Sequence, residues 1–227
     1  MNKVRWKSQI GQDQWVAEVA LPGKREGFFL DVGAHDGFQL SNSYVLETVF
    51  DWKGILIEAN PKTFAEIGKR RKAIAINTCV DGKKGTVRFH FEERAMLGGI
   101  VDSDTSQTER VLKRKMQEGH VGDVVEVNAV PLHEILQEQS APSEIDYLSI
   151  DIEGAETRAL LPFPFDAYAF RVMTVERPKQ VLRDHLDAVG YAEILKYKWD
   201  TFYAHRDLMD VEKLQADSVE FFAKRDR

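Results

Sequence analysis

The segment spanning residues 27–60 constrains the fold more than any other part of the chain. An apolar run, residues 28–32, leads into the loop GAHDG, which has a glycine at each end. A polar SNS at residues 41–43 precedes apolar residues at helical spacing, and a second apolar run, residues 54–57, stops at Glu58. These patterns predict a strand, a sharp glycine turn, a helix and a second strand that is closed by an acid.

This order of elements is suited to binding a nucleoside. Glycines in the turn let a ligand approach the backbone, and the N-terminus of the following helix offers free N–H groups to an anion. Glu58 is placed to accept hydrogen bonds from a ribose diol. The turn has the spacing Gly-x-x-x-Gly and so lacks the middle glycine of the dinucleotide fingerprint. A nucleoside that carries a carboxylate and no pyrophosphate, such as S-adenosylmethionine, fits better; a strand–turn–helix with nothing bound is the alternative.

Length and composition indicate one soluble globular domain over residues 1–227. Hydrophobic residues make up 43% of the chain and charged residues 30%, which argues against disorder. The net charge of −6 argues against nucleic acid as the main partner. Cys79 is the single cysteine, so a disulfide framework and a cysteine-based zinc site are excluded. The polar N-terminus suggests neither a signal peptide nor a membrane span, and a cytoplasmic location is the default expectation.

The rest of the first half predicts further layers of an α/β fold. Residues 1–26 carry the motif SQIGQD and an amphipathic segment, which predict a helical extension. Residues 61–72 read as a helix, and residues 73–80 read as a third buried strand that closes on Asp81. Three strand–helix steps in succession imply a parallel sheet, so Asp81 is expected at the same carboxyl edge as Gly33 and Glu58.

Residues 86–130 depart from this pattern. Alternating apolar and polar residues at 86–91 and 123–130 predict antiparallel, half-exposed strands. Between them, Ser106 and Glu109 form a capping-box pattern ahead of a helix. We interpret the region as an inserted β-hairpin and helix that cover the active face, with a mobile loop at residues 98–104.

The second half returns to buried strands that end on acids. Residues 145–150 are apolar and are followed by DIEGAE, which begins at Asp151, and residues 170–175 are followed by Glu176. A helix that Gly190 ends precedes two alternating runs, residues 191–196 and 201–204, which predict an antiparallel hairpin.

The chain resembles the FkbM-type methyltransferases in motifs that occur in the family's order. These motifs are SQIGQD, GFFLDVGAHDG, SNSY, DWKGILIEANP and SIDIEGAE, within residues 8–205, and DIEGAE is the most specific. The family looks like a member of the S-adenosylmethionine-dependent class. The resemblance therefore implies an α/β fold: a doubly wound, mostly parallel, Rossmann-like sheet of seven strands with a C-terminal antiparallel hairpin.

The resemblance also implies roles for individual residues. Gly33 and its neighbours are expected to hold the methionine part of the cofactor, Glu58 the ribose, and residues 79–81 the adenine. The residues that it places at the cofactor are Gln12, Asp31, Gly33, His35, Asp36, Ser41, Asn42, Glu58, Ala59, Val80 and Asp81. This chain departs from many relatives at His35, where they have asparagine, and at Arg177, where they have histidine.

The family is mostly associated with O-methylation of sugar-like or polyketide hydroxyls, so a small-molecule acceptor is expected. Methyl transfer to oxygen is an in-line displacement that requires alignment and removal of the acceptor proton. We expect Asp151, Glu153 and Glu176 to supply the general base, or Asp151 and Glu176 to hold a divalent ion such as Mg²⁺. The alternatives are a nucleotide-dependent oxidoreductase and a non-catalytic cofactor-binding module of the same fold.

Overall fold

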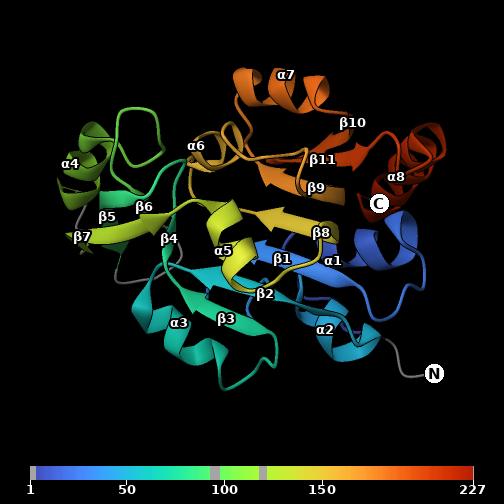
Figure 1. The fold of residues 1–227 in the computed structure, drawn as a ribbon, viewed down its shortest axis with the longest axis horizontal. Helices are drawn as coiled ribbons and strands as arrows, with labels where there is room; N and C mark the ends of the chain where they lie inside the picture. The colour runs from blue at the N-terminus through green and yellow to red at the C-terminus, as the bar shows by residue number, and fades with distance from the viewer. Residues whose placement is uncertain (1–3, 93–97, 118–121, 227) are drawn as a thin grey trace.

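The computed structural model describes residues 4–92, 98–117 and 122–226, and Figure 1 shows its fold. In the described residues, a seven-stranded main sheet has the strand order β10-β11-β9-β8-β1-β2-β3. Its strands are β1 (Phe28–Val32), β2 (Lys53–Glu58), β3 (Ile74–Asn77), β8 (Glu144–Ile150), β9 (Ala169–Glu176), β10 (Tyr191–Tyr197) and β11 (Asp200–His205). The mixed α/β architecture with a large, mostly parallel sheet agrees with the sequence prediction.

The direction of the strands decides where the acids lie. Strands β3, β2, β1, β8 and β9 pair in parallel, whereas β11 runs antiparallel to both β9 and β10. Strands β1, β2, β8 and β9 are long apolar runs because helices cover both faces of the sheet. Their carboxyl ends meet at one edge, so Glu58, Asp151 and Glu176 are brought to the same side of the molecule.

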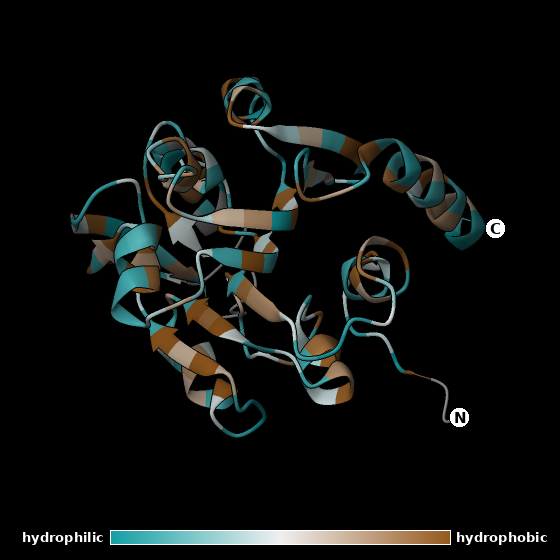
Figure 2. Ribbon diagram, turned by 45° about the vertical axis from the view of Figure 1, so that its right-hand side comes forward, coloured by the Kyte–Doolittle hydropathy of each residue, from teal (hydrophilic) through white to brown (hydrophobic). Residues whose placement is uncertain are grey.

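Helices form a layer on each face of the main sheet. One face packs against α5 (Leu132–Glu138), α6 (Glu156–Leu160) and α7 (Gln180–Ala188). The other packs against α1 (Gln12–Trp15), the π-helix η1 (Val16–Ala20), α2 (Tyr44–Phe50), α3 (Pro61–Ile67) and α8 (Val211–Arg225). In Figure 2, several central strands are brown along their length, while the helix ending at the C-terminus alternates between brown and teal, as an amphipathic covering helix should.

The second sheet lies beyond the carboxyl ends of the main strands, at the left of Figure 1. Its order is β4 (Cys79–Val80), β7 (Gly122–Val130), β5 (Gly85–Glu92) and β6 (Gly99–Ile100), and α4 (Glu109–Gln117) accompanies it. β5 and β7 pair antiparallel, so the alternating runs were read correctly. Residues 93–97 and 118–121 of the predicted insertion lie outside the described residues.

Three local predictions were wrong. The third strand is split, because the chain leaves the main sheet after Asn77 and Cys79 pairs with Ala129 in the second sheet. The helix over residues 61–72 ends at Ile67, where backbone bonds to the third residue back tighten the chain into a turn. The helix in the insertion is capped by Thr108, whose Oγ1 accepts the N–H of Val111, and not by Ser106.

Helix α8 was not predicted. Its N-cap is Asp210, whose side chain accepts the N–H of Lys213 at 3.1 Å. Inside the protein, Trp15 Nε1 donates to Ser218 Oγ at 2.8 Å, and Phe222 packs against the core. The helix therefore pins the N-terminal segment to the sheet. None of the helices in the described part of the chain is both long and apolar enough to cross a lipid bilayer.

The turn after β1 tolerates no side chain at Gly33. A Cβ there would lie 1.9 Å from the backbone oxygen of Asp151, and the residue has a φ of +87°. We expect Gly33→Ala to lower the free energy of unfolding, measured by urea denaturation, by about 2–4 kcal/mol. The loss combines the backbone strain of alanine at a positive φ with the overlap between its Cβ and the oxygen of Asp151.

Gly68→Ala is the matched control. Gly68 has a φ of −60°, and a Cβ there meets no atom within 4 Å. Its substitution should change the free energy of unfolding by no more than about 1 kcal/mol. A Gly33→Ala protein as stable as the wild type would contradict the close contact between the two strand ends.

Candidate active site

A pocket of about 360 Å³ opens at the carboxyl edge of the main sheet. It is lined by the ends of β1, β2, β8 and β9, by Phe89 and Ile100 from the second sheet, and by Gly98, which precedes β6. Open α/β sheets bind ligands at this edge, where the loops after the strands diverge. The pocket is therefore the candidate active site.

Backbone contacts join three strand ends beneath the pocket. The N–H groups of Gly33 and Ala34 both donate to the carbonyl of Ile57, at 2.9 and 3.0 Å. Across the other side, Asp151 N donates to the carbonyl of Val32 at 3.0 Å. Because Gly33 has no Cβ, the loop after β1 can lie directly against Asp151.

Glu58 closes β2 and is held by backbone N–H groups. Its Oε2 accepts from His35 N at 2.8 Å, and its Oε1 accepts from Asn60 N at 2.7 Å. Burial nevertheless raises the pKa of Glu58 to about 7. The hydroxyl of Thr63 also interacts with this carboxyl group. Because a carboxylate can accept about four hydrogen bonds, the side chain keeps capacity to accept from a ligand.

Hydrogen bonds hold the polar side chains that follow the glycine turn. Ser43 Oγ donates to Asp31 Oδ2 at 2.5 Å, and burial raises the pKa of Asp31. Asn42 Nδ2 donates to Ser149 Oγ at 2.9 Å, while its buried Oδ1 has no hydrogen-bond partner in the described structure. Ser41 Oγ accepts the N–H of Tyr44 at 3.1 Å and so supports the start of α2.

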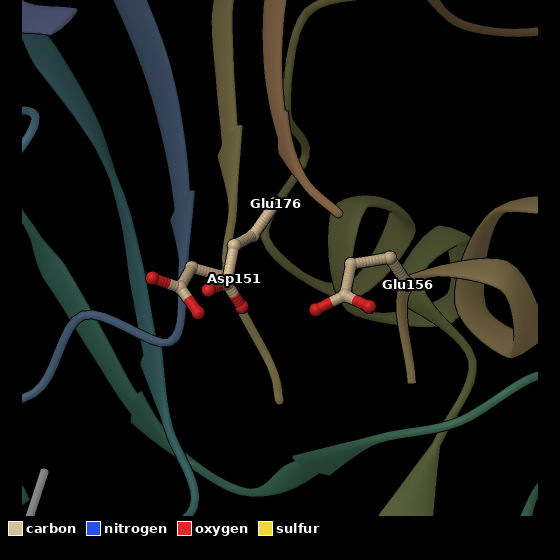
Figure 3. A group of neighbouring side chains, drawn as sticks. All are labelled: Asp151, Glu156 and Glu176. Atoms are coloured by element: carbon tan, nitrogen blue, oxygen red, sulfur yellow. The ribbon is translucent and has the colours of Figure 1, made fainter. Parts of the chain in front are cut away.

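Three carboxylates gather at the ends of β8 and β9 and the start of α6, and two of them, Asp151 and Glu176, line the pocket. Figure 3 shows Asp151, Glu156 and Glu176 with their carboxyl groups in one space, and one oxygen from each lies within 4.8 Å of the others. Burial and the neighbouring charge of Glu176 raise the pKa of Asp151 well above its ordinary value. Asp151 is open to the pocket but surrounded by protein on its other sides. A proton or a cation is needed to keep these groups together.

Glu156 also supports the loop before α6. Its Oε1 accepts the N–H groups of Ile152 and Gly154, at 2.9 and 3.2 Å. Burial raises the pKa of Glu156 to about 7. The sequence reasoning missed Glu156, although its place three residues after Glu153 in DIEGAE put it in the same motif.

Gln12 connects the N-terminal segment to the same acidic edge. Its Nε2 donates to Asp200 Oδ2 at 2.8 Å, and its Oε1 accepts the N–H of Ile10 at 3.1 Å. Asp200 pairs with Glu176 across β11 and β9, and burial raises its pKa to about 6. The neighbouring Asp13 accepts the N–H groups of Lys7 and Ser8, so SQIGQD builds a fixed corner of the pocket.

The structure brings most of the predicted site residues to this pocket. Those that line it are Gln12, Asp31, Gly33, His35, Ser41, Asn42, Glu58, Ala59, Val80, Asp151, Glu153 and Glu176. Glu153 has a φ of +56°, and its carbonyl accepts from Ser106 N at 3.2 Å, which ties the insertion to the pocket wall.

Asp36 and Asp81 do not line the pocket, so the geometry does not support their assignment to the cofactor. Asp36 accepts the N–H groups of Phe38 and Gln39 and pairs with Arg70 at 2.6 Å, which fixes the shape of the glycine loop. Asp81 instead receives two hydrogen bonds from Arg158, each of 2.7 Å.

The raised pKa of Glu58 makes the stability of the unliganded protein depend on pH. The folded state holds the proton more tightly than the unfolded state, whose ordinary pKa is 4.5. The contribution of Glu58 to the free energy of unfolding is therefore full below pH 4.5 and declines as the pH rises to about 7. Relative to Glu58→Gln, we expect the wild type to lose roughly 2 kcal/mol across this window. Urea denaturation at a series of pH values measures this difference, and a constant difference would contradict the burial of an acid at this position.

Comparison with known proteins identifies a family. The model of the methyltransferase FkbM domain matches residues 31–207, which is more than half of the chain and includes the glycine turn and all three clustered acids. No curated protein matches the chain.

Solved structures of methyltransferases show only a distant similarity to this chain. The structure described as the METTL16 MTase domain (crystal form 2) is 12% identical, with a TM-score of 0.43 over 84% of this chain and 63% of that chain. This chain thus spans less than two thirds of that structure. The structure described as a human methyltransferase 10 domain containing protein is 12% identical, with a TM-score of 0.40 over 84% of this chain and 77% of that one.

Proposed function

This chain belongs to the FkbM family of methyltransferases, and we propose that it uses S-adenosylmethionine to methylate a hydroxyl group on a sugar-like or other small-molecule acceptor. The observation that carries the proposal is the juxtaposition of two chemistries in one pocket. The glycine turn with Glu58 lies on one side, and the paired acids Asp151 and Glu176 lie on the other.

The residues on the glycine side suit the cofactor. The remaining acceptor capacity of Glu58 suits the hydroxyls of a ribose, and Gly33 lets a ligand lie against the backbone. The buried Oδ1 of Asn42 lacks a donor, which the ammonium group of a methionine moiety would supply. Ala59, Val80 and Phe89 offer an apolar wall for adenine, and the insertion then covers the bound cofactor.

The residues on the acidic side suit the acceptor. When bound, S-adenosylmethionine supplies an electrophilic methyl group on a sulfonium. The Asp151–Glu176 pair would accept the proton that the acceptor hydroxyl loses on methylation. Because burial and mutual repulsion raise the pKa of Asp151, one member of the pair is a strong enough base for this step. Alternatively, Asp151, Glu156 and Glu176 together hold Mg²⁺, which lowers the pKa of the hydroxyl directly.

The first test concerns the cofactor. We expect Glu58→Ala to weaken binding of S-adenosylhomocysteine by about 1–3 kcal/mol in calorimetric titration, because the ribose donors lose a charged acceptor. Glu66→Ala is the control: Glu66 lies on α3, pairs with Lys69, and does not line the pocket. Equal affinity for wild type and Glu58→Ala would place the ribose elsewhere.

The second test concerns the chemistry. Asp151→Asn preserves shape and removes the charge, so it should lose most methyl transfer, measured as S-adenosylhomocysteine release with a panel of hydroxyl compounds, while still binding the cofactor. Loss of activity on addition of a chelator would favour catalysis by a bound Mg²⁺. Activity that a chelator does not change, but that is lost at low pH, would favour a carboxylate acting as general base. Full activity in both Asp151→Asn and Glu176→Gln would refute a catalytic role for the acids.

The same measurements distinguish a methyltransferase from the two alternatives that the sequence leaves open, an oxidoreductase and a non-catalytic binding module. Tight binding of a nicotinamide dinucleotide without binding of S-adenosylhomocysteine would indicate an oxidoreductase. Binding of S-adenosylhomocysteine without turnover of any hydroxyl compound would indicate a binding module.

A further inference from the structure

A second hollow, of about 310 Å³, adjoins the active-site pocket. We call it the cationic groove and define it by its lining residues, which are Arg177, Pro178, Arg183, Lys196, Lys198, Trp199 and Thr201. Arg177 and Trp199 line the pocket as well as the groove. A single ligand can therefore extend from one into the other.

The charge of the groove contrasts with that of the whole protein. Its lining contains four cations and no acid, although the chain has a net charge of −6. Arg183 pairs with Glu193 at 2.7 Å, and Arg177 lies 3.4 Å from Glu176. Lys196 and Lys198 are exposed and form no ion pair with the part of the chain that the structure describes. Two positive charges of the groove are thus left without a counter-charge.

The fold holds these cations at the carboxyl edge of the sheet. Lys198 and Trp199 form the turn between β10 and β11, where Tyr197 pairs with Asp200. Arg177 N donates to the carbonyl of Trp199 at 2.8 Å, which fastens this turn to the end of β9, one residue beyond Glu176. Lys198 has a φ of +55°, a conformation that glycine or asparagine adopts more easily. The turn therefore places a long cationic side chain in a backbone conformation that is uncommon for lysine.

We propose that the acceptor carries a phosphate group, which binds in the cationic groove while its hydroxyl lies at Asp151 and Glu176. The proposal rests on the proposed function and specifies its substrate class. Arginine forks and lysine point charges together are the usual ligands of a phosphate, and they match its double negative charge. Trp199 lines both the pocket and the groove. Its indole offers an apolar surface for the part of the acceptor that connects the hydroxyl to the phosphate, such as a sugar ring. An extended nucleic acid is disfavoured because the chain has a net charge of −6.

The experiment uses inorganic pyrophosphate as a probe of the groove. It is titrated at low salt into the full-length protein, with and without S-adenosylhomocysteine, and followed by ¹⁵N NMR through the indole N–H of Trp199, which a Trp199→Phe variant assigns. We expect the shifts to centre on Trp199 and Arg177, and malonate, a dicarboxylate, to bind more weakly. The Lys196→Gln/Lys198→Gln double variant should weaken pyrophosphate binding by about fivefold or more.

The Lys69→Gln/Lys72→Gln double variant is the matched control. It removes the same net charge from exposed positions near the opposite edge of the sheet, beyond α3, and should leave the affinity unchanged. Equal weakening in both double variants, absence of pyrophosphate binding, or tighter binding of malonate would overturn the proposal. Much tighter binding of a short oligonucleotide at the same residues would also overturn it, in favour of a nucleic-acid surface. Binding of S-adenosylhomocysteine, measured in the same samples, tests the proposed function separately.

Discussion

The packing of Gly33 against the backbone oxygen of Asp151 is the contact on which the candidate site depends. It leaves no room for a Cβ, so the loop after β1 and the loop after β8 meet directly. This contact sets the distance between the two functional sides of the pocket, because Glu58 holds the same loop through His35 N. A cofactor bound by the glycine turn is thereby aligned with the acids that follow β8 and β9, and alignment is the main requirement of methyl transfer.

The parallel strands also impose an electrostatic cost. They end at one edge and bury acids there, and burial raises the pKa of Glu58, Asp151, Glu156 and Asp200. Such groups lower the free energy of unfolding near neutral pH, since each is easier to ionise in the unfolded chain. Shifts of this kind in a pocket are typical of functional sites. The cationic groove adjoins this acidic pocket, so the same edge of the sheet carries negative groups and positive groups next to each other.

The sequence predicted the parts of the site that follow from strand order. An acid after a buried run must emerge at the carboxyl edge, so Glu58, Asp151 and Glu176 were found without the structure. It did not reveal that Arg158, 77 residues further on, binds Asp81, since nothing local marks such a pairing. The split between β3 and β4 was missed because a mostly apolar run of eight residues reads as one strand. The run is also less buried than predicted, since β3 is the edge strand and Ile74 is exposed. Helix α8 was missed because its apolar residues are sparse. What holds it in place is its contact with a distant residue, Trp15, which the local sequence does not mark.

A crystal structure with S-adenosylhomocysteine tests the central claim most directly. Our account predicts both ribose hydroxyls at about 2.7–3.2 Å from the carboxylate oxygens of Glu58, the amino group at Asn42 Oδ1, and the sulfur facing Asp151 and Glu176. A ribose bound away from Glu58, or a sulfur directed away from the acidic pair, would contradict it.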